Sequence, residues 1–140
     1  VQYESGTEPD ILEKFWHDVK AYERFITFNG RSFDCPFLLI RSALHNIKAS
    51  RNLMPPRFET KTQCDLLEQL TYYGATRKYN LDFYCKSFGI ESPKAHGVTG
   101  NDVADLFAQG QYKVIAEYCF GDVVATAELY KRWRNTISFG

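Results

Sequence analysis

The segment FITFNGRSFD, residues 25–34, decides which fold we expect for this chain. Residues 25–28 form a short β-branched and aromatic run that Asn29-Gly30 ends with a turn, which predicts a strand with a sharp exit. The run is apolar on both faces, as is typical of a parallel strand covered by helices. Asp34 follows the turn, where we expect the strand to give way to a helix and to present side chains to solvent.

Helices are expected on both sides of this strand. Thr7, Pro9 and Asp10 predict a helix start, with Thr7 as the cap, and the apolar periodicity continues to about Arg24. The other expected helices span residues 32–46, 66–73, 81–88, 101–108 and 111–133, and a second short strand is expected at residues 62–65. Gly74 is expected to end the helix at residues 66–73, and Asn80 is expected to cap the next one. Residues 47–61 are expected to form a basic loop. The aromatic residues at helical spacing are expected to lie in the core: Phe33, Phe37, Tyr72, Tyr73 and Phe88.

The composition predicts one folded domain that spans residues 1–140. The chain is 44% hydrophobic and 16% aromatic, which excludes a disordered chain. No apolar run approaches the ~18 residues of a membrane span, so no membrane partner is expected. Lys plus Arg and Asp plus Glu number 17 each, so the chain is not a bulk polyanion binder. Four cysteines without a paired spacing predict reduced, mostly buried thiols in a cytoplasmic protein.

Two groups of polar residues stand out as a candidate reaction site. Tyr118 and Asp122 are four residues apart on an expected helix, so both side chains share one face. A carboxylate can hold a divalent metal while a phenol above it orients a water. Asp34 after the Asn29-Gly30 turn is a second candidate carboxylate. The alternatives are that Asn29-Gly30 is a plain turn, that Asp34 caps a helix, and that Tyr118 and Asp122 are an ordinary surface pair.

Together these motifs resemble the DEDDy group of 3′–5′ exonucleases in the ribonuclease H-like superfamily, in particular bacterial predicted exonucleases related to the proofreading domain of family B DNA polymerases. The resemblance extends over most of residues 10–134. It implies an α/β fold in which Asp34 and Asp122 bind metal and Tyr118 orients the attacking water. It also implies a pair of Mg²⁺ or Mn²⁺ ions and a substrate that is the 3′ end of single-stranded DNA, or alternatively RNA.

The first motif of this family, an Asp-x-Glu on a central strand, is expected before the Thr7 helix, and residues 1–6 contain Glu4 but no such pair. We therefore expect a helix-rich, C-terminal part of the exonuclease fold that lacks its first strands and has little or no nuclease activity by itself. Three explanations stay open: a fragment of a larger exonuclease, a homodimer that covers the exposed sheet edge, and a naturally short relative. The alternative function is a non-catalytic module that binds nucleic acid or protein.

Basic residues between positions 41 and 61 could contact the phosphates of a single strand, although such a patch is as often plain solvated surface. The predicted nucleic-acid-binding residues are Asn29, Arg41, Lys48, Arg51 and Arg57. Asp65 is interpreted as a helix cap rather than a catalytic carboxylate. Lys94 and His96 are expected on a surface loop.

Overall fold

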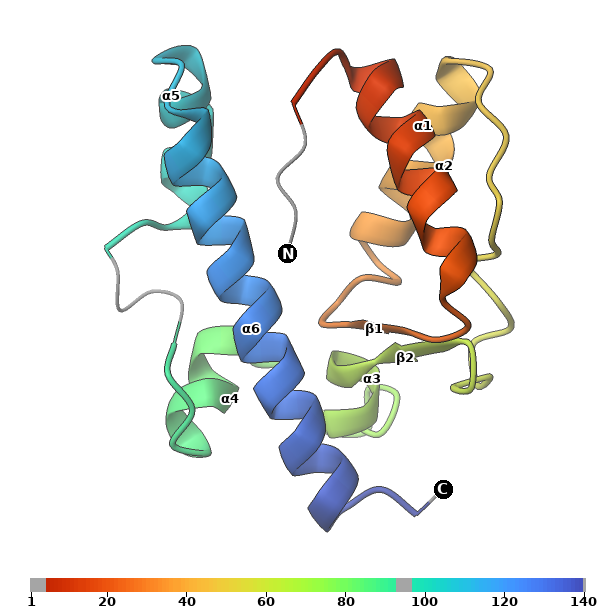
Figure 1. Ribbon diagram of the computed structural model, residues 1–140. Helices are drawn as coiled ribbons and strands as arrows, with labels where there is room; N and C mark the ends of the chain where they lie inside the picture. Colours follow the sequence, from red (N-terminus) through yellow and green to blue (C-terminus); the bar gives the residue numbers. More distant parts are fainter. Residues whose placement is uncertain (1–4, 93–96, 140) are drawn as a thin grey trace. The chain divides into compact units, whose positions relative to one another are not determined.

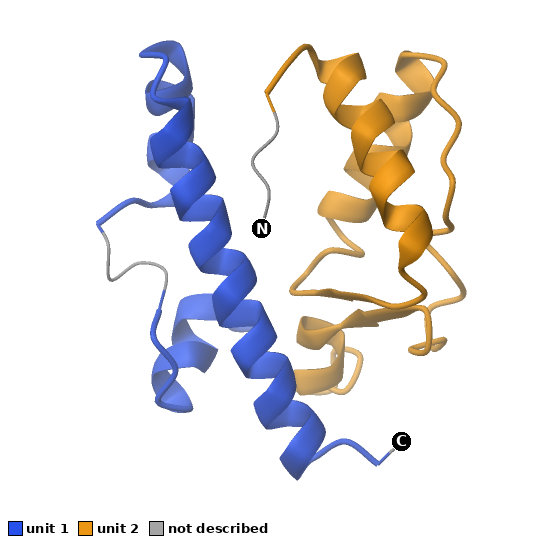
Figure 2. Ribbon diagram, in the orientation of Figure 1, with its two compact units in different colours: residues 1, 77–140 blue, residues 2–76 orange. Residues whose placement is uncertain are grey.

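The computed structural model describes residues 5–92 and 97–139, and the chain divides into two compact units. Unit 2 spans residues 2–76, and unit 1 consists of residue 1 and residues 77–140 (Figure 2). Each unit is described by itself below. Helices predominate in both units. The strands form one small parallel sheet in unit 2, which agrees with the expected α/β fold that is rich in helices (Figure 1). Of the helices in the described ranges, none combines the length and apolar character needed to cross a bilayer.

Unit 2 begins with helix α1, Glu8–Asp18, and the predicted cap is confirmed. The Thr7 hydroxyl accepts a hydrogen bond from the Asp10 amide at 3.4 Å, and the Asp10 carboxylate accepts one from the Thr7 amide at 3.2 Å. These two bonds form a capping box. The predicted end at Arg24 is wrong: a 3₁₀ turn, η1, covers Val19–Ala21, and Tyr22 is already extended. The chain straightens there because it must enter the first strand at Phe25.

The two predicted strands are confirmed and pair in parallel. Strand β1 is Phe25–Thr27 and strand β2 is Gln63–Asp65, with Ile26 opposite Cys64. Helix α2, Asp34–Leu44, lies between them in the sequence, so the order is strand, helix, strand. Residues 47–61 contain no helix or strand, as predicted.

The core of unit 2 forms where α1, α2 and the long loop pack together. Its buried members are Trp16, Val19, Cys35 and Leu53. The Trp16 indole N–H donates to the Ser42 hydroxyl at 2.7 Å, and that hydroxyl donates to the Leu38 carbonyl at 2.6 Å. The buried indole is therefore satisfied, and α1 is tied to α2.

The expectation that the aromatic residues of this unit lie in the core is wrong for Phe33, Phe37 and Tyr72, which are exposed. On α2 the core-facing stripe consists of Cys35, Leu38, Leu39 and Ser42. Positions 33, 37, 40 and 44 fall on the opposite side, since they follow the helical repeat of about 3.6 residues. The α2 sequence is apolar on both sides, so periodicity alone could not decide which side is buried.

Helix α3, Leu66–Leu70, is shorter than the predicted 66–73. The Thr71 hydroxyl donates to the Leu67 carbonyl at 2.6 Å, and Tyr72, Tyr73 and Gly74 then take positive φ values of 50°, 57° and 92°. Two tyrosines in the left-handed region are uncommon, and they end the helix before the glycine that was expected to do so.

A partly buried cluster of charge connects α1 to α2. The Glu8 carboxylate accepts hydrogen bonds from the Arg41 guanidinium, at 2.6 Å from Nε, and lies 2.8 Å from the His45 Nε2. The hydrogen bond from Arg41, followed by that from His45, lowers the pKa of Glu8 from 4.5 to about 2. Arg41, one of the predicted nucleic-acid-binding residues, thus has an intramolecular partner.

We expect Glu8→Gln to lower the melting temperature at pH 7, because a carboxylate with a depressed pKa stabilises the fold wherever it is ionised. The contribution is complete above about pH 4.5 and disappears as the pH falls towards 2. Thermal melts of the wild type and the variant should therefore converge on acidification. Glu13→Gln, an exposed change on the same helix, is the control, and a Glu8→Gln difference that stays constant from pH 7 to pH 2 would contradict this account.

Unit 1 is built on one long helix. Helix α6, Tyr112–Thr136, packs against α4, Leu81–Ser87, and α5, Val103–Ala108 (Figure 1). Its buried residues are Ala125, Leu129 and Trp133, which recur every four positions on one face. The predicted Asn80 cap is confirmed, since its side chain accepts from the Phe83 amide at 2.8 Å. A 3₁₀ turn, η3, covers Gly100–Asp102 just before α5.

Candidate functional site

In unit 2, the Asn29-Gly30-Arg31 turn is held by one buried carboxylate. Asp65 accepts hydrogen bonds from the Asn29 amide at 2.8 Å and the Arg31 amide at 3.0 Å, and it also accepts from the Leu67 amide at 3.0 Å. The residue is 2% exposed. The predicted cap of α3 is therefore confirmed, and the same side chain fixes the end of β1. This second role links positions 34 and 36 residues apart, which no local sequence pattern indicates.

Gly30 is required in this turn by packing. A β-carbon built on it would lie 2.4 Å from the Thr27 β-carbon and 2.6 Å from the Thr27 hydroxyl oxygen, closer than real side chains approach. Asn29 has a φ of 62°, in the left-handed region that Asn tolerates better than most residues. The Asn-Gly pair thus supplies the conformation and the space that bring the chain back towards β1.

Asp34 is the first residue of α2, and its side chain lies at the surface. The helix cap position belongs to Phe33, which makes no capping hydrogen bond, so the alternative that Asp34 merely caps the helix is wrong. Partial loss of hydration, together with the negative charge of Asp65, raises the pKa of Asp34. The turn therefore presents a carboxylate in a local field that is already negative.

Arg31 joins this turn to the long basic loop, a role that was not predicted. Its guanidinium donates to the Pro55 carbonyl at 3.0 Å and lies 3.5 Å from the Glu68 carboxylate. Since its side chain is only 11% exposed, Arg31 is structural. The basic character of Arg31 is visible in the sequence, but its two partners lie far along the chain.

The predicted nucleic-acid-binding residues of the loop differ from one another in their contacts. Arg57 donates to the Tyr73 carbonyl at 3.2 Å, lies 3.6 Å from the Glu68 carboxylate, and sits over the Tyr73 ring. Arg51 donates to the Lys20 carbonyl, and Lys48 is exposed. The arginine interactions hold the loop in place. Nucleic-acid binding by this surface remains a prediction.

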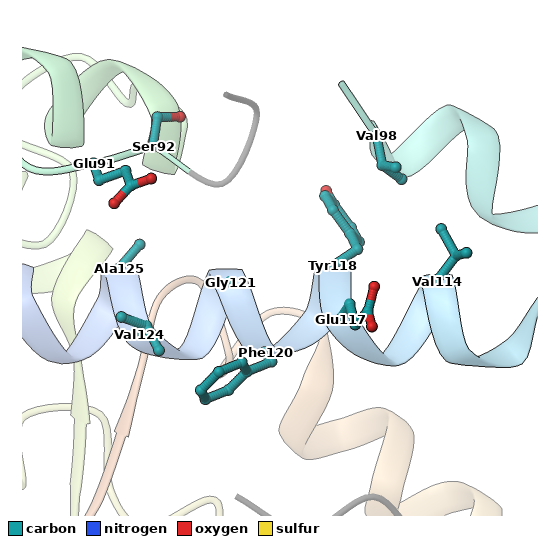
Figure 3. Close-up of a pocket in the computed structure, with 10 residues that line it drawn as sticks. All are labelled: Glu91, Ser92, Val98, Val114, Glu117, Tyr118, Phe120, Gly121, Val124 and Ala125. Carbon is teal, nitrogen blue, oxygen red and sulfur yellow. The ribbon is translucent and has the colours of Figure 1, made fainter. Parts of the chain in front are cut away.

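In unit 1, Tyr118 and Asp122 lie one turn apart on α6, as predicted, and both are half-buried. Tyr118 lines a cavity of about 460 Å³ between α6 and the segments on either side of residues 93–96. Figure 3 shows its side chain extending to the side of α6 on which Ser92 and Val98 lie. Apolar residues make up most of the remaining lining: Val98, Val114, Phe120, Val124 and Ala125.

The tyrosine hydroxyl lies among carboxylates. Burial, and then the negative charges of Asp122 and Asp102, raise the pKa of Tyr118. Its hydroxyl is therefore protonated at neutral pH and can both donate and accept a hydrogen bond. The backbone approaches it closely, because a β-carbon on Gly100 would lie 3.9 Å from the hydroxyl oxygen.

Asp102 also belongs to the surroundings of Tyr118 and was not predicted from the sequence. Asp102 is the last residue of η3, and its carboxylate reaches back to the cap residue Thr99, where it accepts from the amide at 2.8 Å and from the hydroxyl at 2.9 Å. The Thr99-x-x-Asp102 spacing is a capping-box signal that could have located it. On α4, which packs against α6, burial and then the charges of Asp82 and Asp122 raise the pKa of Cys85.

The oxygen donors in each unit, Asp34 in unit 2 and Tyr118 with Asp122 in unit 1, are of the kind that a hard divalent cation takes as ligands. Asp34 lies beside the charge of Asp65, and Tyr118 lies beside the charges of Asp122 and Asp102. A cation near Asp34 would favour its ionised form and so counteract the effect of Asp65. Within residues 5–92 and 97–139, no group of three His, Cys, Asp or Glu side chains is arranged to hold a metal.

Asp34 and Asp122 belong to different units, so a joint metal site stays a prediction. Of the other predicted positions, Glu4, Lys94 and His96 lie outside the described residues. Three of the four cysteines are free and buried as expected, whereas Cys119, beside Tyr118, is exposed.

Comparison with known families assigns the chain to one class. The sequence model of a family described as predicted 3′–5′ exonucleases related to the exonuclease domain of PolB matches residues 1–137. The match covers nearly all of the 140 residues, and the chain belongs to this family. No curated protein matches it.

Proposed function

We propose that this chain carries three of the catalytic residues of a metal-dependent 3′–5′ exonuclease of the DEDDy type, with a ribonuclease H-like fold. By itself it has little or no nuclease activity, because residues 1–140 contain no Asp-x-Glu pair. The substrate is the 3′ end of single-stranded DNA, with RNA as the alternative. Asp34 and Asp122 are the proposed ligands of Mg²⁺ or Mn²⁺, and Tyr118 is the residue that orients the attacking water. Family membership supports the reaction class, and a cytoplasmic location goes with the reduced cysteines.

The observation that carries the proposal is the surroundings of Tyr118. A protonated phenol lies one helical turn from Asp122, with Asp102 also close enough to influence it, at the wall of a cavity large enough for part of a nucleotide. A tyrosine hydroxyl is protonated at neutral pH, so it can hold and orient a water by hydrogen bonding. Tyr118 lines this cavity, whereas Asp122 lies one turn further along α6 and is not part of the lining.

When bound, divalent cations supply an activated water and neutralise charge on the departing oxygen. The chain's own residues do the rest. The Tyr118 hydroxyl accepts a hydrogen bond from the water and fixes its direction, while Asp122 and Asp34 provide carboxylate oxygens on a helix face and at a helix start. Asp65 does not touch the substrate; it keeps the turn before Asp34 rigid, so that this carboxylate needs no reorganisation.

We expect the full protein, as its gene encodes it, to shorten a 5′-labelled single strand one nucleotide at a time from its 3′ end. EDTA should abolish shortening, and Mg²⁺ or Mn²⁺ should restore it, because the proposed ligand set is oxygen only. DNA and RNA strands of one sequence, run in parallel with a strand whose 3′ end is blocked, identify the substrate and the direction. A protein that binds the strand but never shortens it with either metal would refute the nuclease and favour the binding module.

A further inference from the structure

A second surface of unit 1 combines cationic and aromatic side chains. A surface cavity of about 670 Å³ is lined by residues of α4 and of the segment before it: Arg77, Lys78, Tyr79, Asn80, Asp82, Phe83, Lys86 and Ser87. We call this the α4 surface. Three of its side chains are cationic and one is a carboxylate, so its formal charge is positive.

The aromatic rings of the α4 surface are exposed and already ordered. Tyr79 and Phe83 stack with their ring centroids 3.9 Å apart and their planes at 13°, and Phe83 is 44% exposed. The Arg77 guanidinium lies over the Tyr79 ring at 5.2 Å from its centroid. The two rings are stacked in parallel and remain accessible to solvent. They form a platform on which a further flat ring can lie.

The support of this platform is rigid. Asn80 caps α4 by accepting from the Phe83 amide, and the edge of the Tyr84 ring packs against Phe83 at 5.8 Å and 86°. The rings therefore need little ordering when a ligand binds, which keeps the entropic cost of binding low.

The charges of the α4 surface leave Arg77 and Lys78 available to an anion. The one carboxylate, Asp82, is engaged by Lys86 at 3.0 Å and by the Ser92 hydroxyl. Within residues 5–92 and 97–139, no ion pair neutralises Arg77 or Lys78, and both side chains belong to exposed residues. The surface thus offers positive charge beside a flat apolar platform.

We propose that the α4 surface binds single-stranded nucleic acid, with Arg77 and Lys78 on phosphates and an unpaired base stacked on the Phe83–Tyr79 platform. Single strands fit because they expose base faces and phosphates together, whereas a duplex keeps its bases stacked inside. An acidic peptide would use the cations but not the rings. This inference goes beyond the proposed hydrolysis, since the surface can hold a strand whether or not the protein cuts it.

The test is fluorescence anisotropy of a labelled oligothymidylate in EDTA, so that no cleavage is involved. Phe83→Ala should weaken binding by roughly five- to 150-fold, the range that removal of one base–ring stack covers. Phe83→Trp should bind about as well as the wild type. Phe107→Ala, which removes one member of an exposed aromatic pair tilted at 59°, is the matched control and should change nothing.

The cations are tested separately by salt dependence. The double variant Arg77→Gln/Lys78→Gln should bind with a weaker salt dependence. The slope of log affinity against log salt concentration should fall in magnitude by roughly 0.7 for each phosphate that the variant no longer neutralises. Lys131→Gln, in a surface pair on α6, should leave the slope unchanged. Wild-type-like binding by both the Phe83→Ala and the double Gln variants would overturn the proposal. So would equal competition by polyglutamate, or a duplex that binds as tightly as the single strand. None of these outcomes depends on cutting, so they are distinct from failure of the nuclease.

Discussion

Asp122→Asn is expected to abolish cleavage in the gene-encoded protein while leaving affinity for a single strand nearly intact. The side chain keeps its size but loses the charge that would attract a divalent cation, and metal stabilisation of the transition state is worth several kcal/mol. That corresponds to a loss of at least about a thousandfold in rate. The measurement is single-turnover shortening of a labelled strand at saturating enzyme, paired with anisotropy binding in EDTA.

Two further variants separate a metal ligand from a residue that only maintains the helix. Tyr118→Phe removes the hydroxyl and keeps the ring in the cavity, so we expect it to slow cleavage by roughly a hundredfold. Glu128→Gln changes a carboxylate on the same helix that pairs with Lys131 at 2.6 Å, and it should behave as the wild type. Cleavage that survives Asp122→Asn would show that Asp122 is not a ligand, whatever the other variants do.

Asp65→Ala is expected to produce the largest loss of stability, about 3–5 kcal/mol, because it removes the acceptor of three backbone amides from a nearly inaccessible site. Asp65→Asn should cost less, roughly 1–3 kcal/mol. Its carbonyl oxygen can still accept from Asn29 and Leu67, while its amide group is turned towards the Arg31 N–H, which is also a donor. Denaturant unfolding at neutral pH measures both.

The control for these variants is Asp18→Ala, which breaks a surface pair with Lys14 at 2.8 Å. A pair of this kind on a helix surface contributes about 0.5 kcal/mol or less. If Asp65→Ala costs no more than Asp18→Ala, the three hydrogen bonds do not hold the turn, and the rigid presentation of Asp34 that we infer from them has no basis.

The features that the sequence predicted well are those fixed by neighbours in the chain. The Thr7 cap of α1 and the Asn80 cap of α4 are each determined within four residues. The Asn-Gly pair that permits the turn at residues 29–30 is also local, whereas Asp65 holds that turn from a distance. The parallel character of β1 was predicted from a run that is apolar on both faces, and the structure pairs β1 in parallel with β2. Tyr118 and Asp122 share a helix face because their spacing requires it once α6 forms.

The features that it did not predict depend on packing between distant segments. Asp65 was interpreted as a cap, since nothing local indicates that it also reaches Asn29 and Arg31. Phe33 and Phe37 lie on the exposed side of α2, stacked on each other at 6.1 Å, because the other side of that helix fits against Trp16 and its neighbours. The stacked Tyr79 and Phe83 rings depend on rotamers that a sequence does not specify.

The hydrogen bonds that the Asp65 carboxylate accepts also constrain the order in which the molecule can fold. The turn that presents Asp34 is closed by a residue far downstream in the chain, and closing a loop of that length is entropically costly before any interaction rewards it. During synthesis, the turn cannot reach its final geometry until residue 65 has left the ribosome. A nascent chain therefore exposes Asp34 on a still flexible segment, and the proposed catalytic carboxylate is set in place only when β2 docks.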